Sequence, residues 1–177
     1  MDRNNGLDDI DRAILEVLQT DGRITNVKLA RAVGLSQASA LERVRKLEER
    51  GFIEAYRALV NPERVGRATL AWALVSLSFH KQQSVDSFME AISRMEDVLE
   101  CYHVTGEDDF LLKVLVPDMG AYRELLLDLL SRNLGVSHVK TMMVLGTTKR
   151  ETRVPLSPSA SPRRPRRRPG SRASRKG

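Results

Sequence analysis

Helical periodicity interrupted by two turns runs through residues 7–50, and it limits this stretch to a small bundle of three helices. The first helix is predicted to end at Gly22, and Thr25 is a suitable N-cap for the second. Gly34 permits the tight turn that follows, and a third helix is predicted over residues 36–50. Helix, tight turn and helix form a helix-turn-helix motif, whose second helix enters the major groove of DNA.

The predicted third helix has an apolar and a basic face when successive residues are placed about 100° apart. The buried face is expected to consist of Leu41, Val44 and Leu47. Cations on the opposite face suit phosphates, and small polar side chains in the first turn suit base edges. The predicted DNA-contacting residues are Ser36, Gln37, Ala38, Ser39, Arg43, Lys46 and Arg50. The alternative is an ordinary three-helix bundle whose basic face is simply solvated.

The next part of the chain follows the order strand, helix, strand, strand, helix, strand. This is the order of the ferredoxin-like split motif, so the predicted fold class is α+β, a winged helix-turn-helix followed by a ferredoxin-like βαββαβ domain. The apolar run Phe52 to Val60 is predicted to be a wing or a connecting strand. The predicted division is 1–60 for the helix-turn-helix domain with its strand, 61–67 for a linker, 68–154 for the ferredoxin-like domain and 155–177 for a basic tail.

Charge is distributed unevenly along the chain, whose formal net charge is +6. Residues 156–177 contain eight positive charges and no acid, so the rest of the chain is slightly acidic. Residues 23–57 carry a local excess of four positive charges, which indicates a nucleic-acid partner better than the total does. The Arg/Pro/Ser-rich tail cannot bury a core and is expected to be a disordered, solvated end. Its alternative role is a nonspecific DNA anchor.

Several classes of protein are excluded by the residues that are missing. The single cysteine, Cys101, cannot form an intrachain disulfide or a zinc site, and no phosphate loop is present. We therefore expect no enzyme, no metal and no cofactor. No apolar run reaches the ~20 residues of a membrane span. The expected localisation is cytoplasmic.

Four stretches carry a resemblance to a known family: LDDIDRAILEVLQTDGRITNVKLARAVGLS, LERVRKLEERGFIEAYRALVNP, ECYHVTGEDDFLLKVLVPDMGAYRELL and LGVSHVKTMMVLGTTK. In these, from about Leu7 to Val154 and in the right order, the chain resembles the Lrp/AsnC transcription factors. The likeness is greatest to the leucine-responsive branch, notably in DGRITNV, LERVRKLE and VPDMGAYR.

The resemblance implies a ligand-sensing sheet domain, dimers formed through the sheets and commonly tetramers of dimers. It also implies a small amino-acid effector such as leucine, bound between dimers, and control of amino-acid metabolism genes. A nucleoid-associated protein of a bacterium or an archaeon is likewise what the resemblance implies. The implied effector-binding residues are His103, Gly106, Asp109, Met119, Met142, Met143 and Val144. Asp109 suits an ammonium group, Gly106 lets backbone N–H groups approach a carboxylate, and the methionines form an adaptable apolar slot.

Three functions remain open at this point. The first is a sequence-specific, ligand-responsive repressor or activator that binds double-stranded DNA as a homo-oligomer. The second is an architectural nucleoid protein that wraps or bridges DNA with little sequence choice. The third is a metabolic sensor or enzyme subunit that never contacts DNA and whose helical bundle is a protein-docking module. The ratio of affinities for a promoter fragment and for random DNA separates the first from the second.

Overall fold

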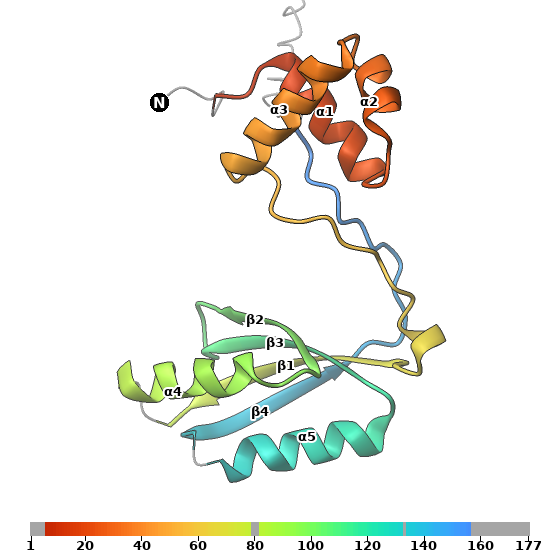
Figure 1. Ribbon diagram of the computed structural model, residues 1–177. Helices are drawn as coiled ribbons and strands as arrows, with labels where there is room; N and C mark the ends of the chain where they lie inside the picture. The colour runs from red at the N-terminus through yellow and green to blue at the C-terminus, as the bar shows by residue number, and fades with distance from the viewer. Residues whose placement is uncertain (1–5, 79–81, 133, 157–177) are drawn as a thin grey trace, which may run out of the picture. The chain divides into compact units, whose positions relative to one another are not determined.

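The computed structural model describes residues 6–78, 82–132 and 134–156, and its contacts divide them into two units (Figure 1). The first unit contains residues 6–57 together with residues 151–156. The second unit runs from Ala58 to Arg150. The division thus differs from the predicted boundaries, because the chain returns to the first unit at Glu151 instead of ending in the sheet domain.

The first unit is a bundle of α1 (Asp9–Thr20), α2 (Asn26–Ala32) and α3 (Gln37–Glu49) (Figure 1). Each helix begins at a side-chain cap. Asp8, Thr25 and Ser36 accept from backbone N–H groups in the first turns of α1, α2 and α3. At α1, the Asp11 side chain in turn accepts from the Asp8 N–H, which completes a capping box. The buried residues of the unit form a small core that consists of Leu7, Ile14, Leu15, Leu29 and Leu47.

The segment after α3 is not the strand that its apolar composition predicted. Residues 53–60 have no regular secondary structure and pair with no strand of the described chain. Ile53 packs against the core of the first unit, whereas Tyr56, Leu59 and Val60 farther along the segment are exposed. A short 3-10 turn, Glu63–Val65, ends at Gly66, whose φ of +76° is a left-handed conformation that favours glycine.

The second unit contains a four-stranded antiparallel sheet and two helices (Figure 1). Its elements are β1 (Thr69–Leu77), α4 (Gln82–Ser93), β2 (Val98–His103), β3 (Phe110–Val116), α5 (Met119–Ser131) and β4 (Val136–Met143). The strands lie in the order β2-β3-β1-β4. The predicted βαββαβ order and the α+β fold class are confirmed.

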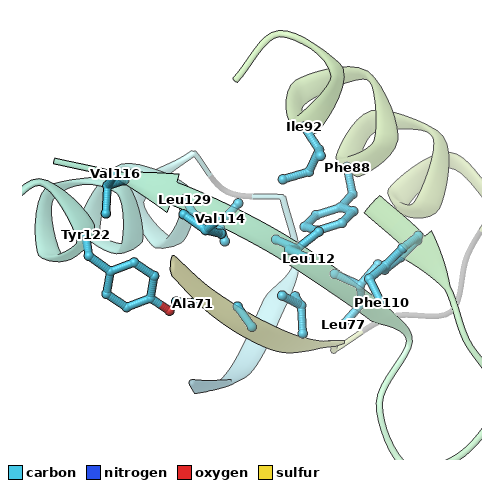
Figure 2. Close-up of a cluster of buried hydrophobic side chains, with 12 residues drawn as sticks. Ala71, Leu77, Phe88, Ile92, Phe110, Leu112, Val114, Val116, Tyr122 and Leu129 are labelled. Carbon is cyan, nitrogen blue, oxygen red and sulfur yellow. The ribbon is translucent and has the colours of Figure 1, made fainter. Parts of the chain in front are cut away.

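Both helices pack on the same face of this sheet. Alternate residues of β1 and β3 are buried beneath them, as expected for strands with one covered face. Phe88 of α4 lies on Phe110 of β3 with ring centroids 4.6 Å apart, and Tyr122 of α5 shares a hydrogen bond with Thr141 of β4 (Figure 2). The opposite face carries the partly exposed side chains of Leu70, Trp72, Leu74, Leu111 and Leu115.

Candidate nucleic-acid interface and effector residues

Short-range hydrogen bonds fix the turn between α2 and α3. Gly34 adopts φ +69°, and the Leu35 N–H donates to the Ala30 carbonyl at 2.9 Å. The Asn26 side-chain amide donates to the Gln37 carbonyl, also at 2.9 Å, so the start of α2 is tied to the start of α3. The helices therefore hold a defined angle, as a helix-turn-helix reading surface requires.

The first turn of α3 is open to solvent. Ser36, Gln37, Ala38 and Ser39 are all exposed. The Ser36 hydroxyl caps the helix by accepting from the Ser39 N–H, and it donates to the Ser39 hydroxyl at 2.9 Å. The predicted base-contacting residues thus lie together on one accessible turn.

The buried face of α3 differs from the predicted one. Leu41 is 59% exposed, whereas Ala40 and Leu47 are fully buried and Val44 is half-buried. Ala40, Val44 and Leu47 have the helical spacing i, i+4, i+7. The helix therefore turns Ala40, and not Leu41, toward the interior of the bundle.

Because the buried face of α3 is centred on Ala40, Val44 and Leu47, the outward-facing residues also differ from the predicted ones. The residues opposite the buried face are Ala38, Glu42, Arg45 and Glu49. Arg45, which is not among the predicted DNA-contacting residues, is 72% exposed and pairs with Glu49 at 2.9 Å. The predicted stripe of Ser39, Arg43, Lys46 and Arg50 lies instead on one flank of α3. The sequence would have predicted this flank position only if Ala40, and not Leu41, had been assigned to the buried face.

Arg43 is bound to the beginning of α1. Its guanidinium donates to Asp8 at 2.6 Å and to Asp11 at 2.8 Å, and only 32% of its side chain is exposed. The pKa of Asp8 lies below its ordinary value, first because the Asp11 N–H donates to the carboxylate and then because Arg43 does. The hydrogen bonds that Arg43 donates to Asp8 and Asp11 raise the pKa of its guanidinium. Arg43 therefore joins the candidate reading helix to the capping box of α1.

The other two flank cations also have partners within the chain. Lys46 pairs with Glu42 at 3.2 Å. Arg50 donates to the Gly6 carbonyl at 3.0 Å and lies over the Phe52 ring, 4.8 Å from its centroid. A shallow hollow on this flank is lined by Asp11, Ser39, Glu42, Arg43, Lys46, Leu47 and Arg50. A DNA phosphate here would compete with acids of the same chain.

Three of the implied effector residues lie near one end of the sheet. The His103 ring stacks on Phe110, 4.9 Å between centroids. Gly106 has φ +132°, in the region that favours glycine. A carboxylate oxygen of Asp109 accepts from the Leu77 N–H at 2.7 Å, so this side chain fastens the turn to β1.

The remaining four lie toward the other end. Met142 and Met143 pair with Trp72 and Ala71 of β1, and the Val144 N–H donates to the Leu70 carbonyl at 3.0 Å. Met119 begins α5, directly after the end of β3. The first group lies beside Val75 of β1, whose carbonyl accepts from the Asp109 N–H, and Val75 is four residue steps, about 13 Å, from Ala71. One chain therefore divides the seven residues into two groups instead of gathering them around one small molecule.

No group of three or more His, Cys, Asp or Glu residues that could hold a metal is found among residues 6–78, 82–132 and 134–156. In the same part of the chain, no helix has the length and apolarity needed to cross a membrane.

Two family descriptions match this chain in sequence. The AsnC-type helix-turn-helix domain matches residues 7–48, and the Lrp/AsnC ligand binding domain matches residues 70–154. The chain belongs to the Lrp/AsnC family. It is therefore a helix-turn-helix transcriptional regulator with a ligand-binding domain, and it is not an enzyme. The predicted resemblance is confirmed, and the plain-bundle interpretation of α1 to α3 is wrong.

Named relatives of this Lrp/AsnC protein agree over most of its length. It is 44% identical over 148 residues to the leucine-responsive regulatory proteins of Escherichia coli K12 and Klebsiella pneumoniae, covering 84% of this chain and 90% of each relative. Among solved structures, it matches a transcriptional regulator of Neisseria meningitidis in complex with L-Met, with TM-score 0.81 and 37% identity over 85% of this chain and 97% of that one. The leucine response regulatory protein of Mycobacterium tuberculosis gives TM-score 0.71 and 32% identity, covering 84% and 99%.

Proposed function

We propose that this protein regulates genes of amino-acid metabolism by reading operator DNA through α3, and that an amino acid modulates this binding. The observation that carries the proposal is the exposed, capped first turn of α3, which a hydrogen bond ties to the start of α2. The helices belong to an AsnC-type helix-turn-helix domain. Gln37 suits adenine and Ser39 suits either base type. Lys46, Arg50 and the outward Arg45 are placed for phosphates.

The proposed effector is a small apolar amino acid such as leucine or methionine. Relatives are named leucine-responsive regulators, and the Neisseria structure holds L-Met. Asp109 is the proposed partner of the effector's ammonium group, because a carboxylate attracts a cation. Because the two groups of effector residues lie apart within one chain, we propose that the site combines residues of two copies.

The uncovered sheet face is the proposed surface through which two copies of the chain form a dimer. Its leucines and Trp72 form an apolar area that a second copy would cover. A polar row crosses the same face, where Lys113 donates to Glu100 at 2.7 Å and lies over the Trp72 ring. Lys113 keeps the pKa of Glu100 below its ordinary value, so this acid stays charged. A dimer, further assembled into a tetramer of dimers, is the proposed oligomer.

The second candidate is architectural DNA binding with little sequence choice. The eight positive charges of residues 156–177 favour it, because phosphate contacts alone give nonspecific affinity.

The decisive experiment compares affinity for a fragment upstream of the protein's own gene with affinity for random duplex at physiological salt. We expect a ratio of at least about 10³, as is usual for specific regulators. Gln37→Ala with Ser39→Ala should reduce that ratio by at least tenfold, with Glu48→Ala on the same helix as the control. A wild-type ratio near one would replace the first candidate with the second.

A further inference from the structure

The segment Glu151–Leu156, the strap, docks along α1 of the first unit, where Figure 1 shows it in blue. The Val154 N–H donates to the Gln19 side-chain carbonyl at 2.6 Å, and the Gln19 amide donates back to the Val154 carbonyl at 3.1 Å. Arg12 donates to the Leu156 carbonyl at 2.9 Å. The Leu156 side chain packs against the core of the three helices. Backbone and side chain together therefore hold the strap on α1.

The strap contacts α1 next to a residue that holds the candidate reading helix. Arg12, which bonds the last residue of the strap, directly follows Asp11 in α1. Asp11 accepts from the Arg43 guanidinium of α3 at 2.8 Å. Leu156 packs on the same core that buries Leu47 of α3. Docking of the strap therefore affects the support of α3 both through the core and through the first turns of α1.

The chain reaches the strap directly from implied effector residues. Met142 and Met143 end β4, and the Val144 N–H donates to the Leu70 carbonyl of β1 at 3.0 Å. The next six residues, 145–150, are all exposed and have no regular secondary structure. Seven residue steps from Val144 to the first strap residue span at most about 25 Å. A short, exposed connection therefore joins the end of β4 to the strap.

The other connection between the units is held in a different way. The Tyr56 hydroxyl donates to Glu48 of α3 at 2.9 Å, and the chain then enters β1 at Thr69, next to the point where β4 ends. Residues 50–57 continue α3 directly, so they move with it. The strap is held only by the three hydrogen bonds to Gln19 and Arg12 and by one leucine. Such a small contact can open while the helices stay folded, as local opening commonly does.

We propose that the strap is the positioning element that couples effector binding at the end of β4 to DNA reading by α3. It has two states, docked on α1 and released. An amino acid in contact with Met142, Met143 and Val144 changes the populations of the two states, because it displaces the start of the connection and so binds them with different affinity. This inference rests on the proposed function, which supplies both the effector and the operator. Neither family description assigns the coupling to the strap.

The first test lengthens the connection without changing a docking residue. A Gly-Ser-Gly-Ser insertion after Gly146 adds slack between β4 and the strap, and exposed irregular segments tolerate such insertions. The matched control is the same insertion between Val60 and Asn61, in the other connection. Operator affinity of each full-length chain is measured with and without saturating L-leucine or L-methionine, and calorimetry measures binding of the amino acid itself.

We expect the amino acid to change the operator affinity of wild type and of the control insertion by at least about fivefold. The Gly146 insertion should still bind the amino acid, yet its operator affinity should change by less than about twofold. A full response in the Gly146 insertion would overturn the inference. Loss of the response in the control insertion alone would also overturn it, because the other connection would then carry the coupling.

A second test observes the strap itself. In wild type, the amino acid should change the hydrogen-exchange rate of the Val154 N–H by at least about fivefold, since docking protects this group. Gln19→Ala with Leu156→Ala should make this exchange fast in both conditions and abolish the response of DNA binding. The matched control is Thr20→Ala, which removes a hydroxyl that contacts the Glu16 carbonyl instead of the strap. An unchanged Val154 exchange rate in wild type that responds to the amino acid would refute the two states.

Failure of the proposed function gives different results. If wild type binds neither amino acid, the proposed effector is wrong and the coupling falls with it. If wild type binds operator and random duplex equally, specific reading is contradicted. In that case, a response measured on random duplex and lost in the Gly146 insertion would still support the strap as the coupling element.

Discussion

The two candidate binding regions hold their key charged residues in different ways. On α3, Arg43 is bonded to two carboxylate side chains, Asp8 and Asp11, near the surface of the bundle. In the sheet unit, Asp109 accepts from a backbone N–H of β1 and lies at a half-buried position. A phosphate can replace a carboxylate around an arginine, because both are anions with matching oxygen geometry. A backbone donor in a strand cannot move away without loss of the local fold, so the contact of Asp109 with β1 is structural. Arg43, by contrast, can exchange its carboxylate partners for a phosphate.

The largest effect that tests this difference is expected at Asp109. Replacement with Ala leaves the Leu77 N–H without its partner and should lower the free energy of unfolding by about 1–3 kcal/mol. Asp109→Asn keeps an acceptor oxygen, so it should retain most of the stability but lose the response to an amino acid. Urea unfolding and effector titration of both variants measure this. Full stability of Asp109→Ala would show that the carboxylate is not a structural fastener.

A smaller effect is expected at Arg43. Arg43→Gln should lower the free energy of unfolding by about 1 kcal/mol, because the pair with Asp8 is half-exposed and screened, while the Asp11 side chain, which is only 11% exposed, also loses its charged partner. The control Arg45→Gln, which removes the outward cation, should leave stability unchanged and reduce the salt slope of DNA binding by about 1. If Arg43→Gln reduces the slope equally at unchanged stability, Arg43 is a phosphate contact and not a link between α1 and α3.

The smallest effect is a pH dependence at Asp8. Its pKa is lowered below the ordinary 3.8, so its charge stabilises the fold above that value, and this contribution is lost as the pH falls through the folded pKa. Asp8→Asn keeps the helix cap without the charge. Wild type should therefore be more stable than the variant at pH 6, by less than about 1 kcal/mol, and the two should converge as the pH falls through the folded pKa of Asp8. A constant difference in melting temperature across this range would exclude the charge as its cause.

Much of the fold followed from local patterns in the sequence. Thr25 and Ser36 begin helices where these were predicted to start, because a side-chain oxygen can satisfy a free backbone N–H wherever a helix starts. The order of strands and helices in the sheet unit followed from the periodicity of apolar residues.

Features that depend on contacts between distant parts of the chain were not predicted. Leu41 has the larger apolar side chain, yet it is exposed and Ala40 is buried, because the packing of α3 in the bundle, and not side-chain size, decides which of its faces is covered. Leu156 is 144 residues from Arg12, and one leucine beside a proline carries no periodicity that indicates docking. The grouping of the effector residues likewise depends on strand register, which their spacing in the sequence does not contain.

The return of Glu151–Leu156 to α1 makes the sheet unit an insertion within the DNA-binding unit. Two separate stretches of backbone cross between the units, one after Arg57 and one after Arg150. A protease that cuts one crossing would yield two fragments under denaturing conditions, yet the native particle would stay whole through the other crossing. Release of a free three-helix piece therefore requires two cuts, and even then residues 151–156 would leave with the helices.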